Sequence, residues 1–465
     1  MNYQPPAQGF RTFVILWFTQ SLSVIGTGIT LFATTIWLTQ VQYPGAEQRP
    51  QLAFALAAVA LAYGIPVVFA APIAGAWADR HDRRLTMIGA NLVSGTLSVC
   101  LVALLLTGTL QLWILLVILV LYSISGSFHF ASFDTSYAML VPEAQLPRAN
   151  GMMHTTYALS AMLGPGIAAA LISLPILARD QKLPAALAAP LRTLGDGTAL
   201  AFALDGITFL SVAIVLLFLA VPSPVRSDLQ SGPGAKKKSM WSDIRIGAMY
   251  ILQRRPLLWL LGTFTLTNII YAPFAVLQPL IVKYNLLLNA QALGFSYETA
   301  LALTTTTLGL GGVVGGFIVS FWGGLKTRRI YGVLVPLGCA ALTLVGFGLT
   351  TILYVAAGMA LIRGLASPMI DAHSQAIWQT QTPRELQGRV FACRRLIAQC
   401  TYPLGTLLAG LFGGFGNPGD KVAVLGAILA LFCFAQLFNP MMLRIEDKEW
   451  LDTLAAGANV AERAK

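Results

Sequence analysis

Charged side chains are scarce in this sequence of 465 residues. Only 11% of the residues are Asp, Glu, Lys or Arg, whereas 56% are hydrophobic. A folded chain of this length needs a polar surface if water surrounds it, and so few charges cannot provide one. The scarcity therefore excludes an ordinary water-soluble protein and indicates that lipid surrounds most of the chain.

Histidine and cysteine are also rare, with four and five residues respectively. The histidines show no HExxH or other paired spacing, and the cysteines form no CxxC pair. The sequence contains no GxSxG serine motif and no glycine-rich phosphate-binding loop. We therefore expect no bound metal, no cofactor, no enzyme activity and no pumping driven by ATP.

Long runs without a charged residue divide the chain. A bilayer core about 30 Å thick requires roughly 20 helical residues, so each run can form a transmembrane helix and the longest can form two. The runs are uniformly apolar and do not alternate, which favours helices over a membrane β-barrel. The runs are residues 12–46, 50–78, 86–133, 149–178, 256–282, 299–325, 330–362, 396–419 and 422–443. Two further apolar stretches, 198–221 and 352–381, contain a few charges and bring the prediction to twelve transmembrane helices.

Basic residues outnumber acidic residues, 30 against 19, and they are unevenly distributed. Most of them lie in alternate loops, which are the cytoplasmic loops if the N-terminus is cytoplasmic. This positive-inside pattern places both chain ends in the cytoplasm, and it explains the net charge of +11 without nucleic-acid binding. We predict a multi-pass protein of the inner (cytoplasmic) cell membrane.

A polar segment divides the chain almost in half. The stretch PSPVRSDLQSGPGAKKKS, which begins at Pro222, has the composition of a flexible linker. The following residues, 240–256, place apolar side chains on one helical face, which is typical of a helix at the membrane interface. We predict an N-terminal six-helix half at 1–221, a cytoplasmic linker with the interfacial helix at 222–247, a C-terminal six-helix half at 248–443 and a cytoplasmic tail at 444–465.

The two halves contain related segments. LVPEAQLPRANG at 140–151 follows the fourth predicted helix, and QTPRELQGRVFA at 381–392 follows the tenth. Likewise, GAWADRHDRR at 75–84 follows the second helix and WGGLKTRR at 322–329 follows the eighth. Two six-helix repeats around a central substrate site are the plan of secondary transporters. We therefore expect an all-α integral membrane protein that transports a solute.

The loop after the second predicted helix resembles the corresponding loop of the major facilitator superfamily. The matching residues are Gly75, Asp79, Arg80, Arg83 and Arg84, and Asp82 stands where the family usually has a second glycine. The resemblance implies the fold of that superfamily. It also implies that the loop helps to set the balance between outward-facing and inward-facing states, with Asp79 contacting the segment 388–395.

The fifth predicted helix resembles that of antiporters in the same superfamily. Gly151, Gly164 and Pro165 match the antiporter pattern, and other small residues, such as Ser160, replace further glycines. Small residues at these spacings allow two helices to approach closely.

Three further stretches, 18–37, 203–211 and 243–256, are similar to the third drug:proton antiporter family, its macrolide-efflux and siderophore-exporter branch. The resemblance implies export coupled to protons.

Polar residues in the first predicted helix recur at intervals that place them on one face. They are Gln20, Ser23, Thr27, Thr30 and Thr34. We interpret this stripe as the wall of a substrate cavity, with packing against neighbouring helices as the alternative. In the seventh predicted helix, the repeat partner of the first, Asn268 and Tyr271 are the candidates for substrate contacts.

Ionisable groups in the apolar stretches need a partner or a function, because their insertion into lipid costs about 2.5–3.5 kcal/mol. Asp205 is the preferred proton-binding candidate, with a role in helix packing as the alternative. For Arg363 we weigh a structural pair with Asp371, a pair that breaks during transport, and an anion site. Asp134 and His373 complete the candidates for proton binding or charge pairing.

These observations predict a secondary active transporter that works as a monomer. Its expected partners are protons, a small-molecule substrate and the lipid bilayer, and its expected function is proton-coupled efflux of amphipathic or lipophilic small molecules by alternating access. Uptake or flipping of a lipid-like solute such as a lysophospholipid is the alternative. A non-transporting membrane receptor and a membrane-embedded enzyme are remote alternatives.

Overall fold

The computed structural model describes residues 6, 8–142, 145–221, 240–451 and 453–454, which form helices and the loops between them. The chain packs as two units. One unit comprises Met1–Gly232 and Ala290–Thr306, and the other comprises Pro233–Asn289 and Thr307–Lys465. Residues 222–239 of the predicted linker and 455–465 of the predicted tail lie outside the described residues.

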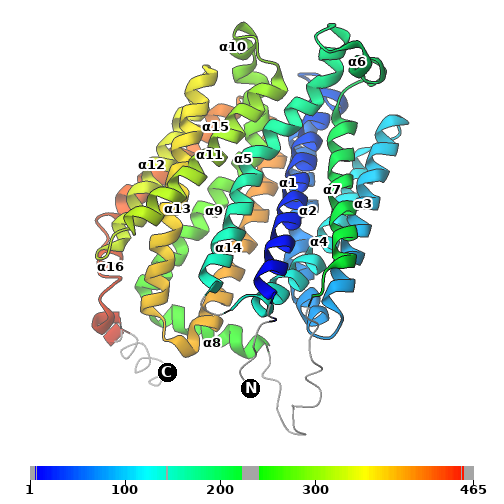
Figure 1. The fold of residues 1–465 in the computed structure, drawn as a ribbon. Coiled ribbons are helices and arrows are strands. Elements are labelled where there is room, and N and C mark those ends of the chain that lie inside the picture. Colours follow the sequence, from blue (N-terminus) through cyan, green and yellow to red (C-terminus); the bar gives the residue numbers. More distant parts are fainter. Residues whose placement is uncertain (1–5, 7, 143–144, 222–239, 452, 455–465) are drawn as a thin grey trace. The chain divides into compact units, whose positions relative to one another are not determined.

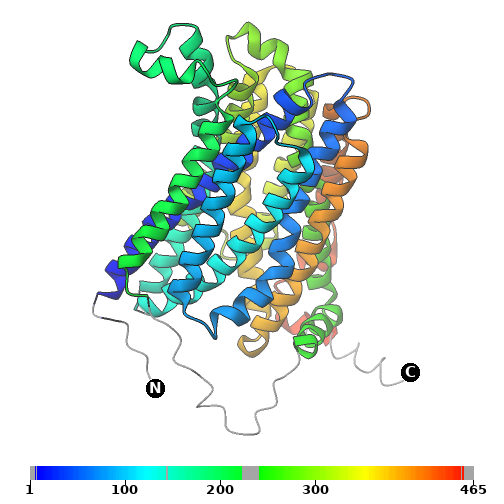
Figure 2. The same cartoon turned by 90° about the vertical axis from the view of Figure 1, so that its right-hand side faces the viewer.

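Six long helices dominate the described part of the first unit, and Figure 1 shows them as rods that run from α1 in dark blue to α7 in green. Their bounds are α1 Gly9–Ile36, α2 Arg49–Ala78, α3 Arg83–Leu106, α4 Leu112–Leu140, α5 Leu146–Arg179 and α7 Thr198–Phe218. The π-helix η1 (Trp37–Gln42) continues α1, and the short α6 (Ala185–Leu191) lies between α5 and α7. In Figures 1 and 2, α6 lies at the end of this unit opposite the turn between α2 and α3.

The second unit repeats this plan. Its long helices are α9 Arg255–Ile281, α11 Tyr297–Trp322, α12 Arg329–Leu349, α13 Leu353–Gln381, α14 Arg384–Phe412 and α15 Pro418–Gln436, and the first turns of α11 belong to the first unit. The shorter elements are α8 Met240–Gln253, η4 Val282–Leu286, α10 Leu287–Ala292 and α16 Pro440–Leu443. In Figures 1 and 2, α8 and α16 lie toward the same end of the second unit.

Eleven helices within the described residues are long and apolar enough to cross a membrane. The twelfth is α14, which spans 29 residues but carries four arginines in its first half, at 384, 389, 394 and 395. These charges lower its hydropathy below that of its neighbours. The predicted fold, twelve transmembrane helices in two six-helix halves, is confirmed.

Helix pairing shows the internal repeat directly. In the first unit, α1 packs against α5 and α7, and α3 packs against α4 and α7. In the second unit, α9 packs against α14 and α15, and α12 packs against α13 and α15. Each of these four pairings in the first unit therefore has a counterpart between the corresponding helices of the second unit.

Polar caps define where several helices begin. The carboxylate of Asp82 accepts a hydrogen bond from the Leu85 backbone N–H (2.9 Å) at the start of α3, and Asn417 caps α15 through Gly419 (2.8 Å). The φ angle of Asp82 is −62°, so this position does not require the conformational freedom of glycine. Asp82 therefore replaces the glycine of the family pattern without strain and contributes an N-cap instead.

Candidate functional site

A buried carboxyl group lies where four helices of the first unit meet. Asp205 on α7 has none of its surface exposed. Its Oδ2 atom accepts hydrogen bonds from Thr30 Oγ1 (2.8 Å), Ser98 Oγ (3.2 Å) and Tyr122 OH (2.8 Å). These donors lie on α1, α3 and α4, so one oxygen atom links three helices to α7.

The other oxygen of Asp205 has a different environment. Oδ1 is buried and has no hydrogen-bond partner among the described residues. It lies against α1, where a β-carbon added to Gly26 would be 2.5 Å from Oδ1 and 2.5 Å from Thr208 Oγ1. The glycine therefore provides the space that the carboxyl group occupies beside α1.

A small cavity lined by both polar and apolar side chains lies next to this carboxyl group, within the first unit. Its volume is about 30 Å³, and because one water needs roughly 10–15 Å³, it has room for about two or three water molecules. Tyr122 joins the cavity to the carboxyl group, because it lines the cavity and its hydroxyl donates to Asp205. Thr27 also lines the cavity, and its Oγ1 lies 3.1 Å from the Tyr122 hydroxyl.

His129 on α4 lines the same cavity and is held by two amide side chains. Asn91 Nδ2 donates hydrogen bonds to His129 Nδ1 (3.0 Å) and to the Met87 carbonyl oxygen (2.7 Å). Since Nδ1 accepts a hydrogen bond, Nε2 carries the ring hydrogen and donates it to Gln20 Oε1. This network holds the His129 ring in place between α1 and α3.

The polar stripe predicted on α1 faces this interior. Gln20, Ser23 and Thr27 line the cavity, and Thr30 donates to Asp205. Thr34 is fully buried, and its Oγ1 has no partner among the described residues. The stripe therefore leads from the cavity to the buried carboxyl group, and its contact with substrate stays a prediction.

Three residues around Asp205 were not singled out from the sequence, namely Gly26, Ser98 and Tyr122. For two of them a periodic signal exists. Intervals of three and four residues relate Asn91, Ser94 and Ser98 on α3, and the same intervals relate Tyr122, Ser125 and His129 on α4. Applying the α1 criterion to every predicted helix would have identified both stripes.

The antiporter-like residues of α5 lie at its contact with α1. A β-carbon added to Gly164 would lie 3.4 Å from the α1 backbone, and the Ser160 hydroxyl donates to an α1 carbonyl oxygen (2.9 Å). Pro165 is buried beside Gly164. Gly151 is exposed, and a β-carbon there would meet no atom within 4 Å. Close approach of two helices is thus associated with Gly164 and Ser160.

The loop between α2 and α3 presents part of its motif to the outside. Gly75 lies in the last turn of α2, whereas Asp79 and Arg80 are exposed. Since Asp79 and the segment 388–395 belong to different units, the contact expected between them stays a prediction.

The two following arginines anchor this loop within the first unit. The buried Arg83 donates to the carbonyl oxygens of Ala78 (3.2 Å) and Thr135 (3.3 Å). Arg84 Nε donates to the carbonyl oxygen of Leu216 (2.8 Å), which lies in the last turns of α7. The motif therefore ties the start of α3 to the end of the sixth transmembrane helix.

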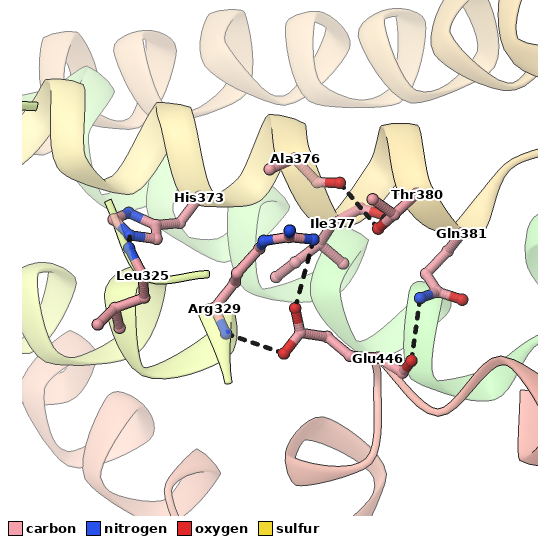
Figure 3. Close-up of polar contacts among 8 residues, drawn as sticks. All are labelled: Leu325, Arg329, His373, Ala376, Ile377, Thr380, Gln381 and Glu446. Carbon is pink, nitrogen blue, oxygen red and sulfur yellow. Dashed lines mark hydrogen bonds and ion pairs between the residues drawn. The ribbon is translucent and has the colours of Figure 1, made fainter. Parts of the chain in front are cut away.

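The second copy of the loop is tied to the chain segment beyond the twelfth transmembrane helix, as Figure 3 shows. The Arg329 backbone N–H donates to Glu446 Oε2 (2.9 Å), and the Arg329 guanidinium lies 3.6 Å from Oε1. Gln381 Nε2 donates to the Glu446 carbonyl oxygen (3.2 Å). Arg84 and Arg329 thus have corresponding positions, but Arg84 binds main-chain carbonyls and Arg329 binds a carboxylate.

His373 on α13 uses both ring nitrogens in local contacts. The Leu325 backbone N–H donates to Nε2 (2.8 Å), and Nδ1 donates to the Met369 carbonyl oxygen (2.7 Å). Figure 3 shows the ring beside Leu325. His373 therefore fastens the loop between α11 and α12 to α13.

The other predicted charges lie apart from one another. Arg363 lies over the Phe274 ring, 3.9 Å from its centroid, and forms no ion pair with Asp371 in the described part of the chain. Asp371 and Asp134 are both exposed on their helices. Asn268 is half-buried on α9, one turn from Tyr271.

Residues 16–406 match the family model of the Major Facilitator Superfamily. The match covers most of the chain, so the chain belongs to this superfamily. It is a multi-pass membrane transporter and not an enzyme, and the resemblance inferred from the loop after the second helix is confirmed.

The chain is also similar to individual proteins. Macrolide efflux protein A of Streptococcus pyogenes is 23% identical over 409 residues, which are 86% of this chain and 89% of that protein. Macrolide efflux protein A of Enterococcus faecalis is 23% identical over 350 residues, covering 73% of this chain and 95% of that protein. The uncharacterized MFS-type transporter YkuC of Bacillus subtilis is 24% identical over 382 residues, with coverages of 82% and 80%. The expected similarity to the macrolide-efflux branch is therefore confirmed.

Solved structures share the fold at low sequence identity. The inward-facing, unoccupied crystal structure of a bacterial homolog of the human lysosomal transporter Spinster has a TM-score of 0.61, 15% identity and coverage of 97% of both chains. A POT family transporter in complex with 5-aminolevulinic acid has a TM-score of 0.65 and 13% identity, covering 93% of this chain and 96% of that one.

Proposed function

We propose that this transporter exports amphipathic or lipophilic small molecules in exchange for protons, by alternating access. Its similarity over most of its length to two proteins named for macrolide efflux supports export, and it makes a macrolide the first substrate to test. In this proposal the protein works as a monomer in the inner cell membrane, with both chain ends in the cytoplasm.

The environment of Asp205 carries the proposal. A carboxyl group that accepts three hydroxyl hydrogen bonds on Oδ2 has no need of a cation, and its unpaired Oδ1 offers a position for a proton. Proton binding would neutralise the group without removing any of its neighbours. A buried carboxyl group of this kind suits a site that exchanges a proton during each transport cycle.

The change in charge has a mechanical consequence. Hydrogen bonds to a charged acceptor contribute about 1.5–3 kcal/mol, compared with about 0.5–1.5 kcal/mol for neutral pairs. Protonation of Asp205 would therefore weaken three interhelical hydrogen bonds by a total of about 3 kcal/mol. A change of that size shifts an equilibrium between two conformations by about a hundredfold.

The proton has a short polar route in this proposal. Water in the adjacent cavity would contact Tyr122 and Thr27, both of which line it. Since Tyr122 donates to Asp205, a proton moving through its hydroxyl would reach the carboxyl group without crossing apolar side chains.

The test is proton-driven transport of a macrolide into everted membrane vesicles by the Asp205→Asn variant. Asparagine keeps one oxygen for the three hydroxyl donors and nearly the same volume, so we expect the protein to fold. It cannot exchange a proton, so we expect gradient-driven accumulation to fall at least tenfold. The matched control is Asp180→Asn, which alters an exposed carboxylate paired with Lys182 (3.6 Å) in the same half. Unchanged accumulation in the Asp205→Asn variant would refute the assignment.

A further inference from the structure

Arg363 is a cation inside α13 without a carboxylate beside it. Its guanidinium lies 3.9 Å from the Phe274 ring centroid and 5.7 Å from the Tyr271 ring centroid. Among the described residues, no hydrogen bond or ion pair joins it to an oxygen acceptor. A guanidinium carries five N–H donors, so its polar binding capacity is unused in this structure.

Arg394 on α14 is a second arginine near aromatic rings, and its contacts can be compared with those of Arg363. Its guanidinium also lies near aromatic rings, 5.3 Å from Trp378 and 5.8 Å from Phe264. Unlike Arg363, however, it donates to Gln375 Oε1 (3.0 Å) and Ser374 Oγ (3.4 Å). Both arginines therefore make cation–π contacts, but only Arg394 also donates hydrogen bonds to oxygen acceptors.

The surroundings of Arg363 contain a second unused donor. The Tyr271 hydroxyl on α9 is buried and has no hydrogen-bond partner among the described residues. Arg363 and Tyr271 are electrostatic neighbours, and Tyr402 on α14 is another neighbour of the guanidinium. Arg363 itself is only half-buried, so part of it stays open to an incoming molecule.

These groups match one class of ligand. A planar guanidinium binds the two oxygens of a carboxylate, or those of a phosphate or sulfate, with two parallel hydrogen bonds. A hydroxyl donor beside it adds a third, and the ring of Tyr271, which is half-buried, supplies an apolar surface for the rest of the molecule. An ammonium group would meet a like charge here and would be repelled.

We propose that Arg363 and Tyr271 bind an oxyanion group, most simply a carboxylate, on an amphipathic molecule with an aromatic or aliphatic body. This assignment adds an anionic class of substrate to the macrolide named above, and as a statement about transport it rests on the export function proposed above. As a binding site it lies within one unit of the protein and depends on no proton gradient.

The test is equilibrium binding to the full-length protein in lipid nanodiscs at equal pH on both sides. The probes are 2-naphthoate, the neutral 2-naphthamide and the cationic 2-naphthylmethylamine, which share one ring system, and calorimetry measures their affinities. We expect 2-naphthoate to bind at least tenfold more tightly than the other two. A 2-naphthoate affinity equal to that of 2-naphthamide overturns the proposal.

Variants locate the site. Arg363→Gln is expected to weaken 2-naphthoate at least tenfold and to leave 2-naphthamide within twofold, whereas the control Arg394→Gln leaves both within twofold. Arg363→Lys keeps the positive charge but loses the planar guanidinium that can donate two parallel hydrogen bonds, so we expect an intermediate affinity for 2-naphthoate. Tyr271→Phe removes one hydroxyl group and should lower the affinity for 2-naphthoate but not for 2-naphthamide. This variant tests the site if Arg363→Gln does not fold. Equal losses in the Arg363 and Arg394 variants, or none in Tyr271→Phe, would contradict the assignment.

The binding test is separate from the transport test. Loss of gradient-driven export in Asp205→Asn with intact 2-naphthoate binding supports both proposals. If the protein binds 2-naphthoate but shows no proton-driven transport in vesicles, the result supports the oxyanion site and refutes the proposed export function.

Discussion

Replacement of Gly26 by alanine tests the geometry around Asp205 most directly. The added β-carbon would lie 2.5 Å from Asp205 Oδ1 and 2.5 Å from Thr208 Oγ1, whereas ordinary contacts of a β-carbon lie at 3.4–4 Å. The overlap is with α7 itself, so either the two helices separate or the carboxyl group turns. Overpacking of this kind costs about 1–3 kcal/mol.

Turning the carboxyl group would have a second effect. Oδ2 would leave the positions at which Thr30, Ser98 and Tyr122 donate to it, so the three hydrogen bonds would weaken together. We therefore expect Gly26→Ala to lower the free energy of unfolding by about 1–3 kcal/mol and to reduce proton-driven transport by more than tenfold.

The assay pairs chemical denaturation of the purified protein with transport in everted vesicles. The control is Gly89→Ala on α3, where an added β-carbon meets no atom within 4 Å and the site is exposed. Both variants add one methyl group inside a transmembrane helix. Equal stability and equal transport for the two variants would refute the packing described for Asp205.

Two further predictions concern the end of the chain. Glu446→Ala removes the acceptor for both donor groups of Arg329, a pair with side chains 25% and 24% exposed. The expected loss in unfolding free energy is about 1 kcal/mol and should shrink at high salt, while Glu449→Ala, at an exposed position, should change little; equal effects of the two would contradict the contact. The hydrogen bond from Arg444 (2.7 Å), together with that from the Trp450 N–H (3.1 Å), holds the pKa of Asp447 below its ordinary value, so the stabilisation is present above that ordinary value and is lost as pH falls through the lowered one. Arg444→Gln should raise the pKa of Asp447, as measured by NMR titration of its carboxyl carbon, and an unchanged midpoint would count against this contact.

The fold was largely predictable because it depends on composition over long windows. Runs without charge predict membrane helices wherever lipid is the solvent. Among the twelve long helices of the described residues only α14, with four arginines in its first half, is less apolar than its neighbours. Its presence was predicted from the charge-free run 396–419, which overlaps the second half of α14.

The site around Asp205 was predictable in part. A carboxyl group in an apolar helix is conspicuous, and the stripe on α1 that contains Thr30 shows a period. The importance of Gly26 could not be predicted, because its role depends on which helix lies against α1 at that height. That pairing is a tertiary fact, and a glycine in a membrane helix has many other uses.

The charges of α13 show the same limit. Arg363 and Asp371 lie two turns apart on one helix, and this spacing suggested a pair. In the structure the Arg363 side chain lies over the Phe274 ring on α9, and Asp371 interacts electrostatically with Arg394 on α14. Residue spacing along one helix gives no information about aromatic rings on another helix. The choice among the three roles of Arg363, namely a structural pair, a pair that breaks during transport and an anion site, therefore required tertiary contacts.

The two loop arginines place different demands on sequence change. Arg84 binds carbonyl oxygens of the main chain at the end of α7, which every amino acid provides, so the contact does not depend on which side chains stand at 216 and 217. Arg329 binds the carboxylate of Glu446, so a change at either position leaves the other without its counterpart. A single substitution at the end of α7 can therefore leave the Arg84 contact intact. The Arg329 contact, in contrast, is kept only if positions 329 and 446 change together. A purification tag or fusion partner that replaces the chain from Glu446 onward would remove the acceptor of Arg329. A tag attached after Glu446 keeps this contact.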